Sequence, residues 1–446
     1  MRKIILALVA AAIVIIIAGA VSWRFLIPGP LAFAGGTPVA LADFHGVDPT
    51  GVPAELKSAD VVKRGEYLAR AADCMVCHTS PGGEEYAGGL AIPLPFGTLY
   101  STNITADKQT GIGNYSDADF LNAVQRGVRR DGTRLYPAMP YPSYTYMTDA
   151  DALAIKAYLF SLAPVRMANR PDTLQFPFNQ RWLMGPWSFF FNEDARFKPN
   201  TARSAEWNRG AYVAEALAHC GDCHTPRNLA FALDNRLKFA GAVAAGWHAF
   251  NITSDRGTGI GAWSDKEIAG YLSSGHASGR GTAAGPMGEA VDHSFSLMVP
   301  ADIDAVVAYL RSIPPLVSSE PATMAPPAPP SPKQGGETAD IIGKRVFEGA
   351  CVSCHGWTGV SALSPFATIA GTRAVNDPAA TNVAQIVISG TARHTPAGII
   401  SMPAFGSIYS DTEIAAVVNY VTKRFGAEGS KISAKEVAAL RTQTSY

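Results

Sequence analysis

Apolar and polar positions follow a helical period that recurs three times along the chain. In each copy an amphipathic stretch comes first, a second ends in glycine, and a third closes the copy. The opening stretches are VVKRGEYLARAADC, EWNRGAYVAEALAHC and IIGKRVFEGAC, and the closing ones are TDADALAIKAYLFSL, PADIDAVVAYLRSI and SDTEIAAVVNYVTKRF. Acidic and hydroxyl residues gather where the closing stretches begin, including a capping box from Ser410 to Glu413. The pattern predicts a mainly α protein made of three tandem units.

Composition shifts set the expected boundaries of these units. We expect the first unit over residues 58–163, the second over 204–314 and the third over 334–426. The segment 164–203 is a connector that contains TLQFPFNQRWLMGPWSFFFNEDARF, 315–333 is a Pro/Ala-rich tether, and 427–446 is a C-terminal tail. Aromatic residues at the density of the connector usually pack between domains. A surface for a partner subunit, a quinone or the membrane is the alternative.

An apolar run from Ile4 to Val21 follows Arg2 and Lys3 at the N-terminus. This pattern predicts a signal or transmembrane helix within residues 1–27, with the remainder of the chain carried across the membrane. An uncleaved anchor is favoured over a removed signal peptide, for which Ala18-Gly19-Ala20 offers a cleavage site. We therefore expect a protein on the periplasmic side of an inner membrane.

Charge and size narrow the class of protein further. Lys plus Arg and Asp plus Glu both number 37 in a chain of 446 residues, so the net charge is zero. Nucleic-acid binding is disfavoured because it needs a surplus of cations. The length allows several domains, in agreement with three repeated units.

All six cysteines occur in three copies of one motif, C-x-x-C-H, which is the attachment signature of c-type haem. The two thiols can add to the vinyl groups of one porphyrin, and the adjacent imidazole becomes an axial ligand of the iron. A redox pair or half of a zinc site would also contain two cysteines, but neither explains three identical motifs. The predicted attachment residues are Cys74 and Cys77, Cys220 and Cys223, and Cys351 and Cys354, with His78, His224 and His355 as proximal ligands.

A constant spacing between glycine and methionine in the three units predicts the distal ligands of the iron. The middle helices end at Gly127, Gly275 and Gly390, and a methionine follows each glycine by twelve residues. These methionines are Met139, Met287 and Met402. Met147 and Met298 compete with them but miss the register, and the six remaining histidines are expected in surface or core roles.

One further phrase is repeated without any reactive group. NITADKQTGIG begins at Asn103 and NITSDRGTGIG at Asn251, each 36 residues before its methionine, and the third unit lacks it. Glycosylation of Asn-Ile-Thr is the less favoured interpretation. The glycines and polar side chains predict equivalent tight turns close to the haem edges.

Taken together, these motifs resemble the triple-haem cytochrome c subunits of bacterial membrane-bound periplasmic dehydrogenases that act on alcohols, gluconate, fructose, aldehydes or N-heterocycles. The resemblance rests on the C-x-x-C-H sites, the NIT phrases, LYPAMPYPSYTYMTDAD around Met139 and FPFNQRW in the connector. It implies three covalent haems, each with a histidine and a methionine ligand. It also implies a separate catalytic subunit of quinoprotein, flavoprotein or molybdenum type, a small accessory subunit in some complexes, and ubiquinone as the electron acceptor.

The expected function is electron transfer without bond-making at any of the three sites. Three alternatives stay open: a catalytic multi-haem protein such as a peroxidase, a haem subunit of a terminal oxidase, and a free-standing carrier. A peroxidase would need an exchangeable distal position with an acid or base beside it, and His276 and His293 near Met287 are the candidates.

Overall fold

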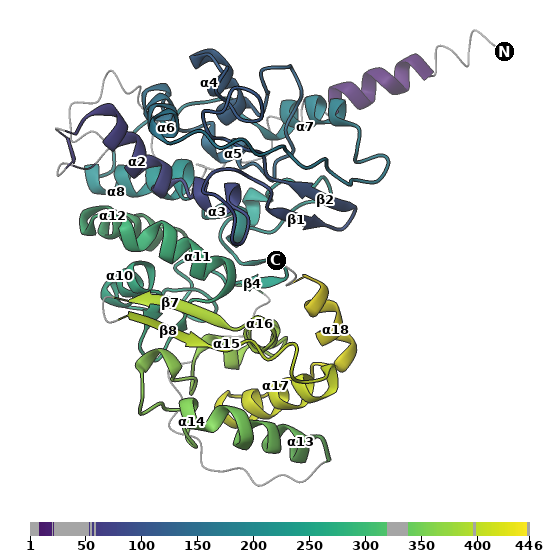
Figure 1. Ribbon diagram of the computed structural model, residues 1–446, viewed down its shortest axis with the longest axis vertical. Helices are drawn as coiled ribbons and strands as arrows, with labels where there is room; N and C mark the ends of the chain where they lie inside the picture. Colours follow the sequence, from purple (N-terminus) through teal and green to yellow (C-terminus); the bar gives the residue numbers. More distant parts are fainter. Residues whose placement is uncertain are drawn as a thin grey trace.

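The computed structural model describes residues 9–19, 21, 53, 56, 57, 59–318, 338–395 and 398–443. The repeated units follow one another down the long axis of the molecule (Figure 1). The helices are α2 Val61–Ala71, α3 Cys74–His78, α4 Asp117–Arg126, α5 Tyr141–Tyr144, α6 Asp149–Ser161, α7 Met184–Phe191, α8 Ala205–Tyr212, α9 Gly221–His224, α10 Asp265–Ser274, α11 Gly285–His293, α12 Pro300–Arg311, α13 Thr338–Val346, α14 Val352–His355, α15 Arg373–Asn376, α16 Thr381–Ser389, α17 Asp411–Phe425 and α18 Ala434–Gln443. The antiparallel hairpins are β1 Ala91–Leu94 with β2 Gly97–Tyr100, β3 Ala242–Ala244 with β4 Trp247–Ala249, β5 His276–Ala277 with β6 Gly281–Thr282, and β7 Thr391–Thr395 with β8 Gly398–Met402.

In every unit the opening helix crosses the closing helix at a glycine. The crossing pairs are α2 with α6, α8 with α12, and α13 with α17. A Cβ atom would lie 1.8 Å from the Ala154 carbonyl oxygen at Gly65, 1.8 Å from that of Ala305 at Gly210, and 2.2 Å from that of Ala416 at Gly343. Only glycine permits so close a contact between backbones. The opening and closing helices predicted from the sequence are confirmed.

The hydrophobic core does not follow the three sequence units one to one. One large cluster joins buried residues from Tyr67 to Ile313 and so runs through the first and second units. A separate cluster, from Val346 to Val437, fills the third unit. Residues 427–446 were expected to be a tail, but Ile432 and Val437 are buried in the third core and α18 packs on α17. Apolar burial therefore extends the third core beyond Gly426.

The first and second units exchange a symmetric pair of buried hydrogen bonds. Tyr67 of α2 donates to Asp302 of α12 at 2.6 Å, and Arg209 of α8 binds both oxygens of that carboxylate at 2.7 Å. In the mirrored arrangement, Tyr212 of α8 donates to Asp151 of α6 at 2.6 Å, and Arg64 of α2 pairs with the same aspartate. We call these four interactions, Tyr67 and Arg209 with Asp302 and Tyr212 and Arg64 with Asp151, the reciprocal clamp. It joins the first two units on both sides of a common interface.

The third unit lacks the residues of the reciprocal clamp. Ile342 and Arg345 stand where the first two units have arginine and tyrosine around the crossing glycine. Glu413, at the third position of α17, caps its own helix through Ser410 instead of reaching a neighbour. The third unit meets the second through other contacts. They include Arg373 with the Thr258 carbonyl and His248 with Asp377 at 2.9 Å.

The aromatic connector is partly buried and partly exposed. Trp187 of α7 donates to the Ala230 carbonyl at 2.8 Å, and Phe178 stacks on Phe96 at 4.0 Å between ring centres. These contacts agree with the expected packing between units. Phe176 is 79% exposed and Trp182 is 67% exposed, so part of the connector also presents aromatic side chains to the outside.

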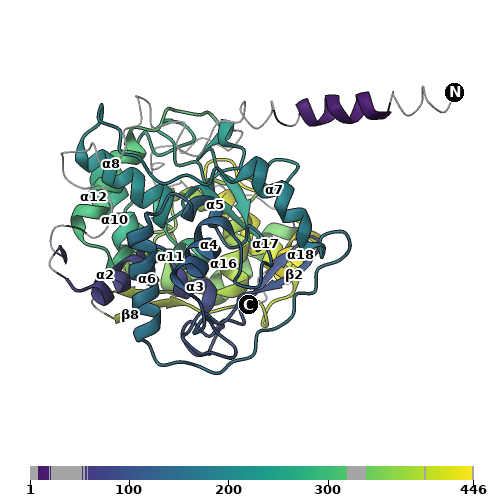
Figure 2. The ribbon, with the colours of Figure 1, turned by 90° about the horizontal axis from the view of Figure 1, so that it is seen from above.

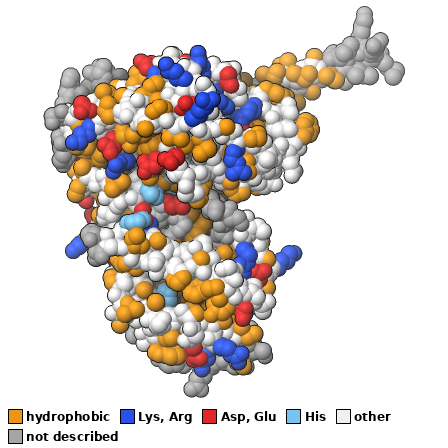
Figure 3. Space-filling model, viewed as in Figure 1, with side chains coloured by type: hydrophobic (Ala, Val, Ile, Leu, Met, Phe, Trp, Pro, Cys, Tyr) orange, Lys and Arg blue, Asp and Glu red, His pale blue; other side chains and the backbone are white. Residues whose placement is uncertain are grey.

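The described part of the N-terminal apolar run is helical, at residues 9–19 and 21, and it projects from the body (Figures 1 and 2). Its side chains are exposed and hydrophobic (Figure 3). Residues 1–8, 20 and 22–27 of the predicted segment lie outside the described residues. Within the described ranges, no helix combines the length and the apolarity that crossing a bilayer requires.

Candidate functional site

Each C-x-x-C-H motif forms a short helix immediately after the opening helix of its unit. These helices are α3, α9 and α14. In the second and third units a π-helical turn, Val213–Leu217 or Phe347–Cys351, joins the opening helix to the motif. π-helical turns are rare and concentrate at functional sites. They were not predicted from the sequence.

The three proximal histidines share one orientation. His78 Nδ1 lies 2.7 Å from the Thr102 carbonyl oxygen, His224 Nδ1 2.6 Å from that of Phe250, and His355 Nδ1 2.6 Å from that of Ala367. A carbonyl can only accept, so Nδ1 carries the proton and donates it. The lone pair then resides on Nε2, and the ring is held as a metal ligand requires. Sequence reasoning missed these carbonyl partners.

None of the six cysteines forms a disulfide, and five of them are partly buried. Burial raises the pKa of the Cys74, Cys77 and Cys220 thiols to about 12, and of Cys223 and Cys351 to about 11. A reactive redox pair would need a low-pKa thiolate. The environment of these thiols therefore disfavours a reactive redox pair. Among the described residues, no three or more His, Cys, Asp or Glu side chains gather as a metal site would require.

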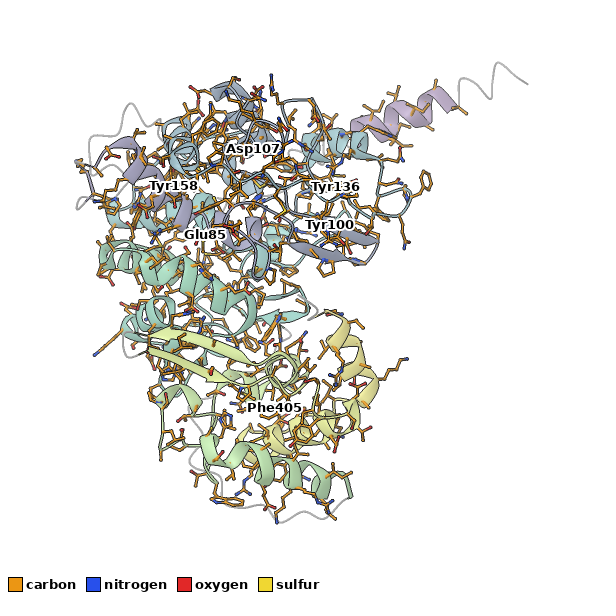
Figure 4. The ribbon with its side chains drawn as sticks, in the orientation of Figure 1. Glu85, Tyr100, Asp107, Tyr136, Tyr158 and Phe405 are labelled. Carbon is orange, nitrogen blue, oxygen red and sulfur yellow. The ribbon has the colours of Figure 1, made fainter. Side chains whose placement is uncertain are left out.

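One cavity of about 800 Å³ touches all three attachment motifs. Its lining includes Cys77 of the first motif together with most of the second and third motifs. Cys77 and Cys223 are close enough for their charges to interact, since Cys223 contributes, after burial and Asp73, to the raised pKa of Cys77. The other lining side chains are mainly apolar, among them Phe405 of the third unit (Figure 4). A volume of this order suits a cofactor of porphyrin size.

Two of the three predicted methionine ligands line this cavity. Met287, near the start of α11, lies there with His224, and Met402, at the end of β8, lies there with His355. Met139 is outside the cavity lining and instead packs, with Cys74, against the core shared by the first two units. The competitors Met147 and Met298 are buried within that core. The residues present thus fit haem best at the second and third sites, where thiols, an oriented imidazole and a thioether border one apolar space.

The repeated phrase follows directly on the carbonyl that each of the first two proximal histidines uses. Asn103 comes immediately after Thr102, and Asn251 immediately after Phe250. The Asn251 amide donates to Thr258 at 3.0 Å and to the Leu316 carbonyl at 2.7 Å, and its oxygen accepts from the Thr253 amide at 2.8 Å. Asn103 makes the corresponding bonds in the first unit. The two turns are equivalent, as predicted, and each fixes the backbone behind its histidine.

We expect Asn251→Ala to destabilise the protein by about 2 kcal/mol because it strands buried donors and acceptors, each costing about 1–3 kcal/mol. Chemical denaturation followed by circular dichroism measures this loss. Arg256→Ala is the matched control, since Arg256 is exposed within the second copy of the phrase. An exposed change should alter stability by less than about 0.5 kcal/mol. Equal losses for both variants would contradict the anchoring role.

Three of the remaining histidines, His248, His276 and His394, contact side chains outside the attachment motifs. His276 Nδ1 contacts Thr282 at 3.0 Å and its ring lies against Phe366. Neither His276 nor His293 is among the lining residues of the cavity, and His276 Nε2 is buried without a hydrogen-bond partner. His219 and His248 do line it, and His248 is bound to Asp377. His45 lies outside the described residues.

Paired crossing helices, C-x-x-C-H turns with oriented histidines and an apolar cavity define a c-type cytochrome with several attachment sites. Residues 62–163 match the cytochrome c family, and residues 339–421 match the family described as cytochrome c oxidase, cbb3-type, subunit III. The chain belongs to the family of cytochrome c subunits of bacterial dehydrogenases.

Three relatives illustrate this membership. The gluconate 2-dehydrogenase cytochrome c subunit of Pantoea cypripedii is 38% identical over 93% of this chain and 94% of its own length. The fructose dehydrogenase cytochrome subunit of Gluconobacter japonicus is 36% identical over 88% of this chain and 85% of its own length. A nicotinate dehydrogenase subunit of Pseudomonas putida is 39% identical over 87% of this chain, which spans only 32% of that longer protein.

Proposed function

We propose that the protein is a three-haem cytochrome that carries electrons from a catalytic dehydrogenase subunit to ubiquinone in the membrane. The observation that carries this proposal is one cavity that residues of all three C-x-x-C-H motifs border. Sites that border one mainly apolar space are suited to passing electrons from one to the next. The names of the relatives, which are cytochrome subunits of several dehydrogenases, support the assignment to an electron-transfer role.

The proposed organisation has three haem units, at residues 58–163, 204–314 and 334–426. Cysteine pairs would hold each haem by thioether bonds, and the ligand pairs would be His78 with Met139, His224 with Met287, and His355 with Met402. Bound haem supplies one-electron iron chemistry. The protein's own contribution is to donate each histidine Nδ1–H to a fixed carbonyl, to supply a thioether ligand that favours a comparatively high potential, and to exclude water.

The catalytic partner is proposed to be a quinoprotein, a flavoprotein or a molybdenum subunit, with a small accessory subunit in the complex. The apolar run at residues 4–21 would anchor the chain in the inner membrane, with the haem units on the periplasmic side. The exposed aromatic side chains of the connector, Phe176 and Trp182, support a surface facing a partner or the membrane.

Haem stoichiometry tests the proposal directly. The protein, matured in a host that attaches c-type haem, is expected to carry three haems per chain by intact mass and by haem absorbance. Replacing Cys220 and Cys223 together by alanine should leave two. A wild-type count of two or fewer would overturn the three-haem assignment.

A terminal-oxidase role is a second candidate because residues 339–421 match a subunit of such an enzyme. That match covers the third unit alone, whereas the dehydrogenase relatives align with most of the chain. Co-purification in detergent separates the two. A dehydrogenase subunit in the complex supports the main proposal, and an oxidase subunit would replace it.

A further inference from the structure

The β7–β8 hairpin of the third unit connects the predicted methionine ligands of two sites. Thr391 pairs with Met402 at one end of the hairpin, and Arg393 lies two residues further along β7. The Arg393 guanidinium crosses into the second unit and forms an ion pair with Asp292 of α11 through Nη2. Because α11 begins at Gly285 and carries Met287, this ion pair ties the third unit to the methionine helix of the second.

Arg393 is buried yet incompletely bonded. Its side chain is 4% exposed, and Nε donates to the Ala392 carbonyl at 2.8 Å. Nη1 is buried and has no hydrogen-bond partner. A buried donor of a charged group without an acceptor costs more than about 1–3 kcal/mol, so an acceptor is expected from a group that enters the site.

The unpartnered nitrogen lies at the second site. A Cβ atom on Gly288, the residue after Met287, would stand 3.2 Å from Nη1. Arg393 also lines the cavity shared by the second and third sites. Of the other lining arginines, Arg280 is bonded to Glu267 and to the Ala262 carbonyl, and Arg373 to the Thr258 carbonyl.

We infer that Arg393 is a positioning residue of the second haem site: its Nη1 donates to a carboxylate of the haem held there, and its buried charge raises that haem's reduction potential. The inference rests on the proposed function, because it requires a haem at Cys220, Cys223 and His224. A porphyrin propionate is the acceptor whose charge and planar oxygen pair match a guanidinium. A buried cation disfavours the oxidised iron, which carries one more positive charge than the reduced iron.

Removing either partner of the Arg393–Asp292 ion pair tests the inference, because the two variants should shift the reduction potential of the second haem in opposite directions. Arg393→Gln removes the cation and should lower the potential of the second haem. Asp292→Asn removes the anion and should raise it. Loosened packing alone would move the potential in the same direction in both variants, so opposite shifts separate a charge effect from a structural one.

The measurement is a spectroelectrochemical titration of the haem-loaded protein. We expect Arg393→Gln to make reduction of one haem about tenfold less favourable, which is about 59 mV for a one-electron couple, and to leave the other two haems unchanged. Met287→His identifies which wave belongs to the second site, since bis-histidine ligation lowers the potential of that haem. His394→Gln is the control, because His394 contacts the same Asp292 oxygen but is 66% exposed; it should leave all three waves in place.

Haem counting keeps this inference separate from the proposed function. If the chain carries three haems, any of three results would overturn the role of Arg393. The first is no shift in Arg393→Gln, and the second is shifts of equal sign in Arg393→Gln and Asp292→Asn. The third is a shift in a haem other than the one that Met287→His identifies. A wild-type chain that carries no haem at the second site would instead overturn the function on which it rests.

Discussion

Replacing Asp302 by alanine is expected to destabilise the joined first and second units by about 3–5 kcal/mol. Asp302 is 2% exposed, and it accepts hydrogen bonds from Tyr67 of the first unit and from both Nε and Nη2 of Arg209. Its removal leaves a buried guanidinium without its carboxylate. The free energy lost by leaving the Arg209 charge unpaired is larger than the free energy gained by no longer burying the Asp302 carboxylate.

Equilibrium unfolding of the haem-loaded protein, followed by circular dichroism and by haem absorbance, measures the effect. Asp304→Ala is the matched control because Asp304 is on the same helix and exposed. Tyr67→Phe removes one hydrogen bond to a charged group and should cost about 1.5–3 kcal/mol. If Asp302→Ala and Asp304→Ala unfolded at the same denaturant concentration, the reciprocal clamp would not hold the two units together.

The reciprocal clamp also shows what the sequence could have revealed. The first two units share Arg-Gly-x-Tyr in their opening helices and an aspartate at the third position of their closing helices. The third unit has Ile-Gly-Lys-Arg and a glutamate that caps its own helix. The repeated phrase at Asn103 and Asn251 indicated the same kinship between the first two units. That these residues would cross from one unit to the other was not predictable, because helical periodicity reports burial and not the identity of the partner.

Sequence patterns that involve only neighbouring residues predicted the helices and turns that such residues determine. Apolar periodicity, capping residues and C-x-x-C-H spacing predicted the opening and closing helices and the places of the attachment turns. The hairpins were missed because strands of two to five residues next to glycines give no sustained alternation. The helix α18 was missed although Ser433 and Glu436 form a capping box at its start, and its burial depends on contact with α17.

The predicted ligand residues stand at different levels of support. Met287 and Met402 border the cavity with their histidines, while Met139 is outside the cavity lining and packs against the core of the first two units. The carbonyl partners of His78, His224 and His355 could not be foreseen, since a backbone acceptor has no side-chain signature. Only the position of Thr102 and Phe250, directly before a repeated phrase, offered a signal.

Met287→Ala is expected to change the chemistry of the second site qualitatively. Loss of the thioether would open the sixth position of the iron, so the reduced variant should bind about one carbon monoxide per chain while the wild type binds none. The potential of that haem should also fall, which would make it a poorer acceptor within the relay. Absorbance difference spectra recorded with and without carbon monoxide measure the first effect.

Met298→Ala separates ligation from packing in the same unit. Met298 is buried in the core shared by the first two units, so its loss should lower stability by about 2–5 kcal/mol without any binding of carbon monoxide. If Met298→Ala bound carbon monoxide and Met287→Ala did not, the distal ligand would be Met298 and the register of twelve residues after glycine would be wrong. Binding by the wild type would favour a catalytic haem over a relay, because electron transfer alone needs no exchangeable position on the iron.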